Sequence, residues 1–217
     1  PSLGADIDAG FPAGETTTLA LPITGYPAPV LTTSALPAWL TFDAITGVFS
    51  ANPAVGDSGP GGTVTVTATS VAGVTQIDVT LEVTSPPAVA ASGGTVTVLA
   101  GEMVNESLTA VTGYPEPTVT ATGVPSGLAL SLVEGVLTLT GSTSDSGTHA
   151  ITVTLANGSG PDLDVPWTVV VNEPAALSVP TDATGVLGDA LDIEIVATGY
   201  PAPTVTVTGL PDGLTFQ

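Results

Sequence analysis

The sequence predicts an all-β protein whose β-sandwich domains follow one another in a linear array. Three observations lead to this fold class: a six-residue pattern that occurs three times, strands in which Val and Thr alternate, and proline-rich connectors between the copies. Tyr26, Tyr114 and Tyr200 hold the same place in the three copies and lie 88 and then 86 residues apart (114 − 26 and 200 − 114). A repeat of this length is a small domain and not one turn of a solenoid.

The repeated pattern is Thr-Gly-Tyr-Pro-x-Pro, and it occupies residues 24–29, 112–117 and 198–203. Its paired prolines cannot donate hydrogen bonds to a strand ladder, which excludes a helix and favours a sheet edge or a crossover. We therefore interpret the motif as structural. Its central residues are Gly25, Tyr26, Pro27, Gly113, Tyr114, Pro115, Gly199, Tyr200 and Pro201.

Other landmarks recur in register with this motif. An apolar residue followed by proline stands ten residues after each tyrosine, and Asp-Ser-Gly occupies 57–59 and 145–147. These spacings predict domains at 1–85 and 86–172, and the N-terminal half of a third domain at 173–217. A half sandwich cannot cover its apolar face. Either the missing strands belong to a longer chain from which this sequence is a piece, or another subunit adds them.

The first domain is expected to consist of short strands joined by turns. In residues 63–69, Thr alternates with Val or Ala, which is the period of a strand with one face in a core and the other in water. Residues 43–47 predict the turn of a hairpin, with a glycine at its end. The expected strands, in chain order, cover 16–21, 39–42, 48–50, 63–69 and 77–83.

The second domain repeats this plan with different side chains. Trp39 of the first domain and Trp167 of the second each lie in an apolar strand, so we interpret both as core residues and not as a ligand platform. The dipeptide Asn157-Gly158 predicts a tight hairpin turn. Proline-rich linkers at 85–87 and 172–174 should stay extended and allow limited bending between the domains.

The charge of the chain restricts its partners. It has 20 acidic residues, no Lys or Arg and one His, which gives a formal net charge of −20. Binding to nucleic acid or to an anionic membrane surface needs cationic side chains, so both partners are excluded. No apolar run reaches the roughly 18 residues that a membrane helix requires, and we expect no insertion into a membrane by this segment.

The sequence offers little for catalysis or for cofactor binding. It lacks cysteine, a second histidine and any cation that could stabilise an oxyanion, so we predict that the protein is not an enzyme and has no cofactor. His149 is expected to make a single hydrogen bond at a corner of the fold. Asp162 and Asp164 could contribute a weak calcium contact, but calcium needs six to eight oxygen ligands. Asn105 and Asn157 begin glycosylation sequons.

Two segments carry a family resemblance. Residues 36–50, Leu-Pro-Ala-Trp-Leu-Thr-Phe-Asp-Ala-Ile-Thr-Gly-Val-Phe-Ser, precede an Asp-Ser-Gly turn and an alternating Thr/Val strand, and residues 207–216 repeat the opening of this pattern. The chain thereby resembles the cadherin-like, dystroglycan-type immunoglobulin-like (Ig-like) repeats found in tandem in large bacterial surface and secreted proteins. The resemblance implies Ig-like sandwiches that serve as spacer, adhesive or assembly modules. The acidic calcium motifs of true cadherin junctions are missing here.

We therefore expect a structural or adhesive repeat segment of an extracellular protein, located on a cell surface or in a secreted filament. End-to-end domains would form a rigid stalk, and strand edges without Lys could associate between copies of the chain. The alternatives are a carbohydrate-binding accessory module of a secreted enzyme, with a glycan or another surface ligand as partner, and a virion decoration protein. The second class needs exposed aromatic residues, of which the chain has few.

Overall fold

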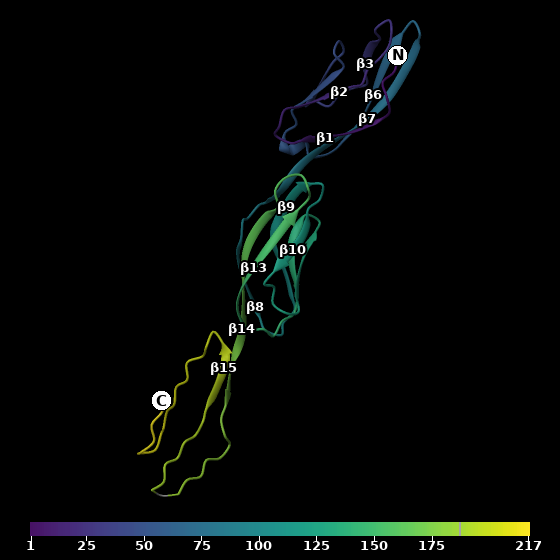
Figure 1. Cartoon of the computed structure of the whole chain (residues 1–217). Helices are drawn as coiled ribbons and strands as arrows, with labels where there is room; N and C mark the ends of the chain where they lie inside the picture. Colours follow the sequence, from purple (N-terminus) through teal and green to yellow (C-terminus); the bar gives the residue numbers. More distant parts are fainter. Residues whose placement is uncertain (187) are drawn as a thin grey trace. The chain divides into compact units, whose positions relative to one another are not determined.

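The computed structural model describes residues 1–186 and 188–217, and its regular structure consists almost entirely of β-strands (Figure 1). This confirms the predicted fold class. The contacts within the chain separate it into two compact units, each described here by itself. The first unit comprises Pro1–Ala90, Ala110–Val119 and Thr154–Asp164, and the second comprises Ala91–Thr109, Thr120–Val153 and Val165–Gln217.

The first repeat folds as two facing sheets. One sheet places β7 between β1 and β6 and has β3 at its far side, and the other has the order β2-β5-β4. β1 runs parallel to β7, whereas the pairs β2–β5, β4–β5, β3–β6 and β6–β7 are antiparallel. The strands are β1 Ile7–Pro12, β2 Thr17–Ala20, β3 Val30–Thr33, β4 Leu40–Asp43, β5 Val48–Ala51, β6 Gly59–Ser70 and β7 Gly73–Val89, and a short 3-10 turn, η1, covers Val55–Asp57.

The alternating strand behaves as its period predicts. Val64, Val66 and Ala68 of β6 are buried, whereas the threonines between them point away from the core. The buried side chains of β6 and β7 meet those of the second sheet in one aliphatic core. Two aromatic contacts complete this core: Phe42 against Phe49 with ring centroids 4.6 Å apart, and Phe11 against Trp39 at 5.7 Å.

The predicted hairpin at 43–47 is present, and Asp43 organises it. The Asp43 carboxylate accepts hydrogen bonds from the backbone N–H of Ile45 and from the hydroxyl of Thr46, at 2.8 and 2.7 Å. The N–H of Gly47 closes the turn on the Asp43 carbonyl. These donors stabilise the ionised carboxylate, and the pKa of Asp43 therefore lies below its usual value, chiefly through the Thr46 hydroxyl.

The second repeat reproduces this arrangement strand for strand. Its sheets contain the orders β10-β13-β14 with β8 beside β14, and β11-β12-β9. Trp167 is 7% exposed and pairs with Gly94 across the β8–β14 ladder, where a Cβ on the glycine would lie 2.7 Å from the indole ring. The strands are β8 Gly94–Leu99, β9 Val104–Tyr114, β10 Thr118–Thr122, β11 Leu128–Val133, β12 Val136–Gly141, β13 Gly147–Ala156 and β14 Leu163–Ser178.

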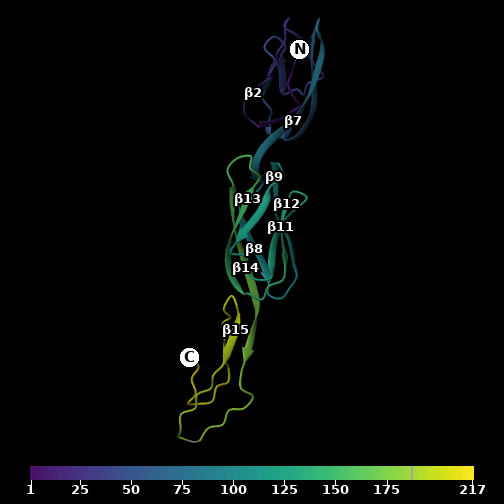
Figure 2. The same ribbon diagram turned by 45° about the vertical axis from the view of Figure 1, so that its right-hand side comes forward.

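Both predicted linkers lie inside strands. β7 continues through Ser85-Pro86-Pro87 and pairs with the end of β9, and β14 continues through Asn172-Glu173-Pro174 and pairs with β15, Val196–Tyr200 (Figure 2). The linkers are extended, as predicted. Each linker also belongs to a ladder. The ladder tolerates its prolines because they fall where the register shifts, between Ser85 and Ala88 and between Glu173 and Ala176. The domain boundaries at 85 and 172 stay predictions.

One predicted turn is wrong. The expected tight turn at Asn157-Gly158 would join adjacent strands directly, but residues 157–162 all separate β13 from β14. The physical reason is that the Asn157 side chain is engaged elsewhere. Its amide donates to the carbonyl oxygens of Ser85 and Pro115, both at 2.8 Å, which draws the start of the loop toward the repeated motif.

Candidate functional site

The three copies of the Gly-Tyr-Pro motif have one backbone conformation. In each copy the peptide bond between tyrosine and proline is cis. The preceding glycine has a positive φ, at 151° for Gly25, 141° for Gly113 and 139° for Gly199, a region that residues with a side chain rarely adopt. The motif is therefore a conserved shape within this chain, as its spacing predicted, and glycine is required by the backbone at this position.

The glycine also lets the incoming strand approach closely. A Cβ on Gly113 would lie 3.1 Å from the Pro86 carbonyl oxygen and from the Pro87 Cα. At Gly199 the corresponding atoms are Cα of Ala175 at 3.0 Å and the Pro174 carbonyl oxygen at 3.2 Å. These two motifs thus pack against the segment that arrives from the preceding repeat, and a side chain on the glycine would push that segment away.

Tyr114 lies at the junction between the first repeat and the second. Its backbone N–H donates to the Ser85 side-chain oxygen at 3.1 Å. Its side chain is half-buried and helps to line two shallow grooves in the first compact unit. One groove includes Pro60 and Glu82, and the other includes Ser58. Tyr114 therefore sits beside the Asp-Ser-Gly turn of the first repeat.

The loop after β13 closes on the same junction. In addition to the two bonds from the Asn157 amide, the Ser159 hydroxyl donates to the Tyr114 carbonyl oxygen at 3.2 Å. The Asn157 carbonyl oxygen Oδ1 accepts from the Ser159 N–H at 3.0 Å, which fixes the orientation of the amide. The side chain of Asn157 consequently joins the last residue of the first predicted domain to the motif of the second.

Tyr200 makes an equivalent contact in the second compact unit. Its Oη atom lies 2.6 Å from Oγ1 of Thr148, the residue that directly follows the second Asp-Ser-Gly. Pro60 holds that place after the first Asp-Ser-Gly, and it lines the same groove as Tyr114. The Ser146 hydroxyl also donates to the Glu173 carboxylate at 2.9 Å, which ties this turn to the incoming strand.

Tyr26 differs from the other two tyrosines because its side chain is 96% exposed. The backbone around it is otherwise the same as in the later copies. Ser2 forms a β-bridge with Thr24, as Ala88 does with Thr112 and Ala176 with Thr198. The motif by itself thus does not bury its tyrosine.

The remaining predicted residues have the following positions. His149 makes the expected corner contact, with Nε2 2.9 Å from the Asp145 carbonyl oxygen. Asn105 is exposed on β9, whereas Asn157 is partly buried and hydrogen-bonded. The Asp164 carboxylate accepts from the Thr154 hydroxyl at 2.6 Å. Within residues 1–186 and 188–217, no three His, Cys, Asp or Glu side chains are grouped closely enough to hold a metal ion.

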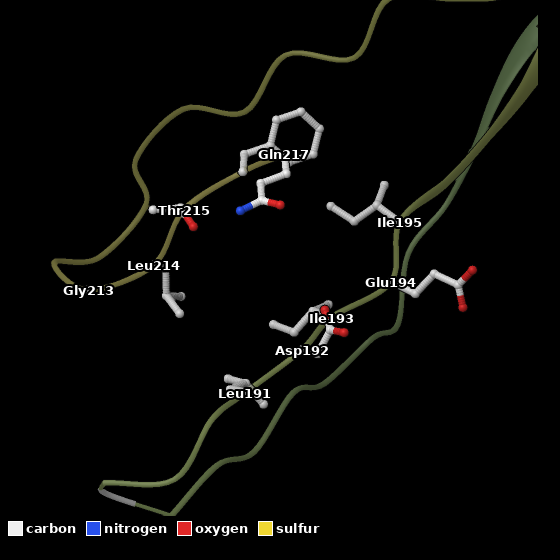
Figure 3. A pocket seen from close by; sticks show the side chains of 10 residues that line it. Leu191, Asp192, Ile193, Glu194, Ile195, Gly213, Leu214, Thr215 and Gln217 are labelled. Atoms are coloured by element: carbon white, nitrogen blue, oxygen red, sulfur yellow. The ribbon is translucent and has the colours of Figure 1, made fainter.

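The third repeat presents an open apolar face. Leu191 and Ile193 on one segment face Leu214 on another across a cavity of about 460 Å³ (Figure 3). These three side chains are 37–40% exposed, in contrast to the fully buried Leu137 and Leu139 of the second repeat. Among the described residues beyond Ser178, only Val196–Tyr200 forms a strand. The face lacks the strands that close the first two repeats.

Several strand edges also carry exposed apolar side chains. β3 and β11 stand at the two ends of one strand order, and they present Val30 at 69% and Val133 at 53% exposure. Lysine, a common guard of such edges, is absent from the sequence. In the part of the chain that the structure describes, no helix is long and apolar enough to cross a membrane.

Sequence reasoning recognised the motif but not its contact partners. The sequence did contain a signal for these partners, because the Asp-Ser-Gly landmark recurs in register with the tyrosines. Two landmarks that recur together can belong to one shared interface. The sequence could not show that the tyrosine of one repeat meets the turn of the repeat before it, since the spacing only relates landmarks along the chain.

Comparison with known proteins agrees with this architecture. Residues 4–84 match a family profile described as "Putative Ig domain". No curated protein sequence matches the chain. The family match covers the first repeat, and together with the solved structures described next it confirms the Ig-like part of the resemblance drawn from the sequence.

The similar solved structures are tandem Ig domains. The I-band fragment I67-I69 from titin has a TM-score of 0.53 and 19% identity, covering 89% of this chain and 73% of its own. Extracellular domains 3–5 of Drosophila OTK have a TM-score of 0.51 and 16% identity, covering 77% and 59%. The N-terminal four Ig domains of Dscam1 have a TM-score of 0.51 and 18% identity, covering 78% and 44%. Identities this low establish the fold alone.

Proposed function

We propose that this chain is a structural segment of an extracellular protein, in which Ig-like domains follow one another as a stiff stalk or filament. The observation that carries the proposal is the continuity of β7 and β14. Each strand begins in the ladder of one repeat and ends in the ladder of the next, with only the two residues at each register shift between them. An extended chain held by ladder hydrogen bonds resists bending more than a flexible connector does.

The contacts at the junction add to this support. The Ser85 hydroxyl and carbonyl, the Asn157 amide and the Ser159 hydroxyl together fix the start of the second repeat. Ser146 and Thr148 do the same for the third. These groups are neutral or acidic, as they must be in a chain without Lys and Arg. Stiffness would thus depend on hydroxyl and amide hydrogen bonds and not on ion pairs.

An extracellular location is consistent with the composition. The chain offers no Lys or Arg for trypsin-like proteases, it contains no cysteine, and its formal charge of −20 opposes non-specific binding to nucleic acid. We propose a cell surface or a secreted filament as the location. No cofactor is needed for this function, and calcium is not invoked at the junctions, which contain Ser85 and Pro86, and Asn172 and Glu173.

Small-angle X-ray scattering of the chain tests the stalk. A stiff array should give a single narrow distribution of interatomic distances, and insertion of Gly-Ser-Gly-Ser between Pro86 and Pro87 should broaden it toward shorter distances. The matched control is the same insertion in the exposed turn at Ala72-Gly73, which leaves the junction intact. If the unaltered chain already samples the broad distribution, the stalk proposal is wrong.

Self-association is a second role that specific observations favour. The unguarded edges of β3 and β11 carry exposed Val30 and Val133. Edges of this kind can pair with a strand of another chain. Sedimentation velocity over a range of concentrations tests it, with Val30→Lys and Val133→Lys as edge-guarding variants. A monomer at every concentration would rule out this role.

The carbohydrate-binding alternative has less support. Sugar sites use exposed aromatic rings, and of the five Trp and Tyr side chains only that of Tyr26 is largely exposed. Trp39 packs on Phe11, and Trp167 is buried. Tyr114 and Tyr200 are half-buried at repeat junctions. We therefore do not propose a glycan as the partner of these residues.

A further inference from the structure

We infer that the surface around Tyr26 is a docking site for the Asp-Ser-Gly end of another Ig-like domain of this repeat, joined to the chain at Pro1. The inference rests on the proposed stalk, since it extends the same junction to the first repeat. The other two copies of the motif indicate the occupant, because in both the tyrosine lies near the Asp-Ser-Gly turn of the preceding repeat.

In both later copies the tyrosine lies near the residue that follows the Asp-Ser-Gly turn. Tyr114 shares a groove with Pro60, and Tyr200 lies 2.6 Å from Thr148. Pro60 and Thr148 both follow the Asp-Ser-Gly turn of the repeat that comes before the tyrosine. A tyrosine ring is a suitable group for this place, since it combines an apolar body with a hydroxyl that can meet either an apolar or a polar residue.

The first copy of the motif, around Tyr26, makes the same backbone contacts as the two later copies. Pro1 lies against Gly25 as Pro87 lies against Gly113 and Ala175 against Gly199, with the nearest Cα 3.0 to 3.1 Å from the Cβ that each glycine lacks. Pro1 therefore already occupies the position against the motif that Pro87 and Ala175 hold in the later copies. Tyr26 itself is 96% exposed, which leaves its ring free to meet such a turn.

The surface near Tyr26 is also more apolar than its counterpart in the second repeat. Val30 pairs with Thr69, and Thr69 pairs with Val74, so the two valines flank one threonine on the same sheet face. They are 69% and 62% exposed. Four residues after Tyr114, the residue corresponding to Val30 is Thr118. Apolar side chains left in water at the end that holds an unpaired tyrosine are typical of an interaction surface.

The test is a chain in which residues 1–86 are added directly in front of Pro1. The new Pro86-Pro1-Ser2 connection then reproduces Pro86-Pro87-Ala88, and the Asp57-Ser58-Gly59 turn of the added domain can reach the original Tyr26. Tyr26 of the added domain is changed to Phe so that the nitrated peptide is unambiguous. Nitration of tyrosines by tetranitromethane, followed by peptide mapping, measures the exposure of each ring.

In the unaltered chain, Tyr26 should react several-fold faster than Tyr114 and Tyr200. In the extended chain its rate should fall to that of Tyr114 in the same molecule. A matched control inserts Gly-Ser-Gly-Ser between Pro86 and Pro1, which keeps both domains but uncouples them, and should restore the fast rate. If Tyr26 reacts equally fast in all three chains, the docking site does not exist.

The same samples separate this inference from the proposed function. Scattering that shows a stiff array together with a reactive Tyr26 contradicts the docking site and leaves the stalk standing. Protection of Tyr26 together with a broad distribution of distances contradicts the stalk and leaves the docking site standing. Protection that persists in the uncoupled control would mean that the ring is covered by another surface, and it would overturn the assignment of the Asp-Ser-Gly turn.

Discussion

The phenol oxygen of Tyr200 lies 2.6 Å from the hydroxyl oxygen of Thr148, and this contact joins the motif of one repeat to the turn of the repeat before it. The two residues are 52 positions apart in the chain. Through this hydrogen bond the Tyr200 ring reaches the residue that follows the Asp-Ser-Gly turn of the preceding repeat. Four expectations for the junctions follow from such contacts, and one concerns the hairpin of the first repeat.

Replacing Tyr200 by Phe removes this hydrogen bond and keeps the ring. A net hydrogen bond at a partly exposed position stabilises by about 0.5–1.5 kcal/mol. We expect the protection of the β15 amides from hydrogen exchange to fall by about two- to tenfold, because that free energy corresponds to such a ratio. Tyr26→Phe is the control and should change no protection. Equal effects of the two substitutions would contradict a role for the Tyr200 hydroxyl.

Replacing Gly113 by Ala introduces a side chain at a positive φ of 141° and 3.1 Å from the Pro86 carbonyl oxygen. We expect a loss of about 2–4 kcal/mol in the free energy of unfolding, the sum of backbone strain and displacement of the strand. Gly73→Ala is the matched control, since Gly73 has a φ of 130° with nothing within 4 Å of the added Cβ. It should lose about 1 kcal/mol. Urea denaturation measures both.

Replacing Asn157 by Ala removes the donors to the Ser85 and Pro115 carbonyl oxygens. The carbonyl oxygens of buried Ser85 and exposed Pro115 then lose this donor, and we expect a cost of about 1–3 kcal/mol in urea denaturation. Asn105→Ala, at an exposed position, should stay within about 0.5 kcal/mol of the unaltered chain. A cost at Asn105 as large as at Asn157 would show that the loss does not arise at the junction.

Glycosylation should distinguish the two sequons. A glycan is attached to the side-chain nitrogen of asparagine, and at Asn157 this atom donates to two carbonyl oxygens at 2.8 Å. Asn105 is exposed on β9. When the chain is secreted from a host that carries out this modification, intact-mass measurement should show a glycan that Asn105→Gln abolishes and Asn157→Gln does not. The opposite pattern would mean that the loop opens before the modification.

Acid should weaken the first repeat through Asp43. Hydrogen bonds from Thr46 and Ile45 lower the pKa of Asp43 in the folded state. The ionised carboxylate therefore stabilises the fold above its unfolded pKa of about 3.9, and this contribution is lost as the pH falls through the lower folded pKa. The difference in unfolding free energy between the unaltered chain and Asp43→Asn should be constant near neutral pH and shrink below about pH 4. Thr46→Val, which removes the principal donor, should show the same convergence.

Much of the local structure could be predicted because it depends on short-range patterns. The alternation in residues 63–69 gave the buried face of β6, and the spacing of Asp43 and Gly47 gave the hairpin between β4 and β5. The corner hydrogen bond of His149 was likewise expected from the turn that precedes it. Each of these features is decided by residues that are neighbours in the chain.

The prediction at Asn157 failed for the opposite reason. An Asn-Gly pair favours a tight turn when nothing else competes for the asparagine side chain. Here Ser85 and Pro115 compete for it, and they lie 72 and 42 residues away. The linkers show the same limit: proline content predicted an extended segment, but not that β7 and β14 continue into the ladder of the next repeat.

The sequence alone determined the repeat, the fold class, the aliphatic cores and the absence of ion pairs with Lys or Arg, because all of these follow from composition, period and spacing. The tertiary structure alone decided what the repeated motif contacts. Tyr114 and Tyr200 are half-buried and Tyr26 is exposed, although all three have the same immediate sequence. Burial is a property of the surface that arrives from elsewhere in the chain, and neighbouring residues do not specify it.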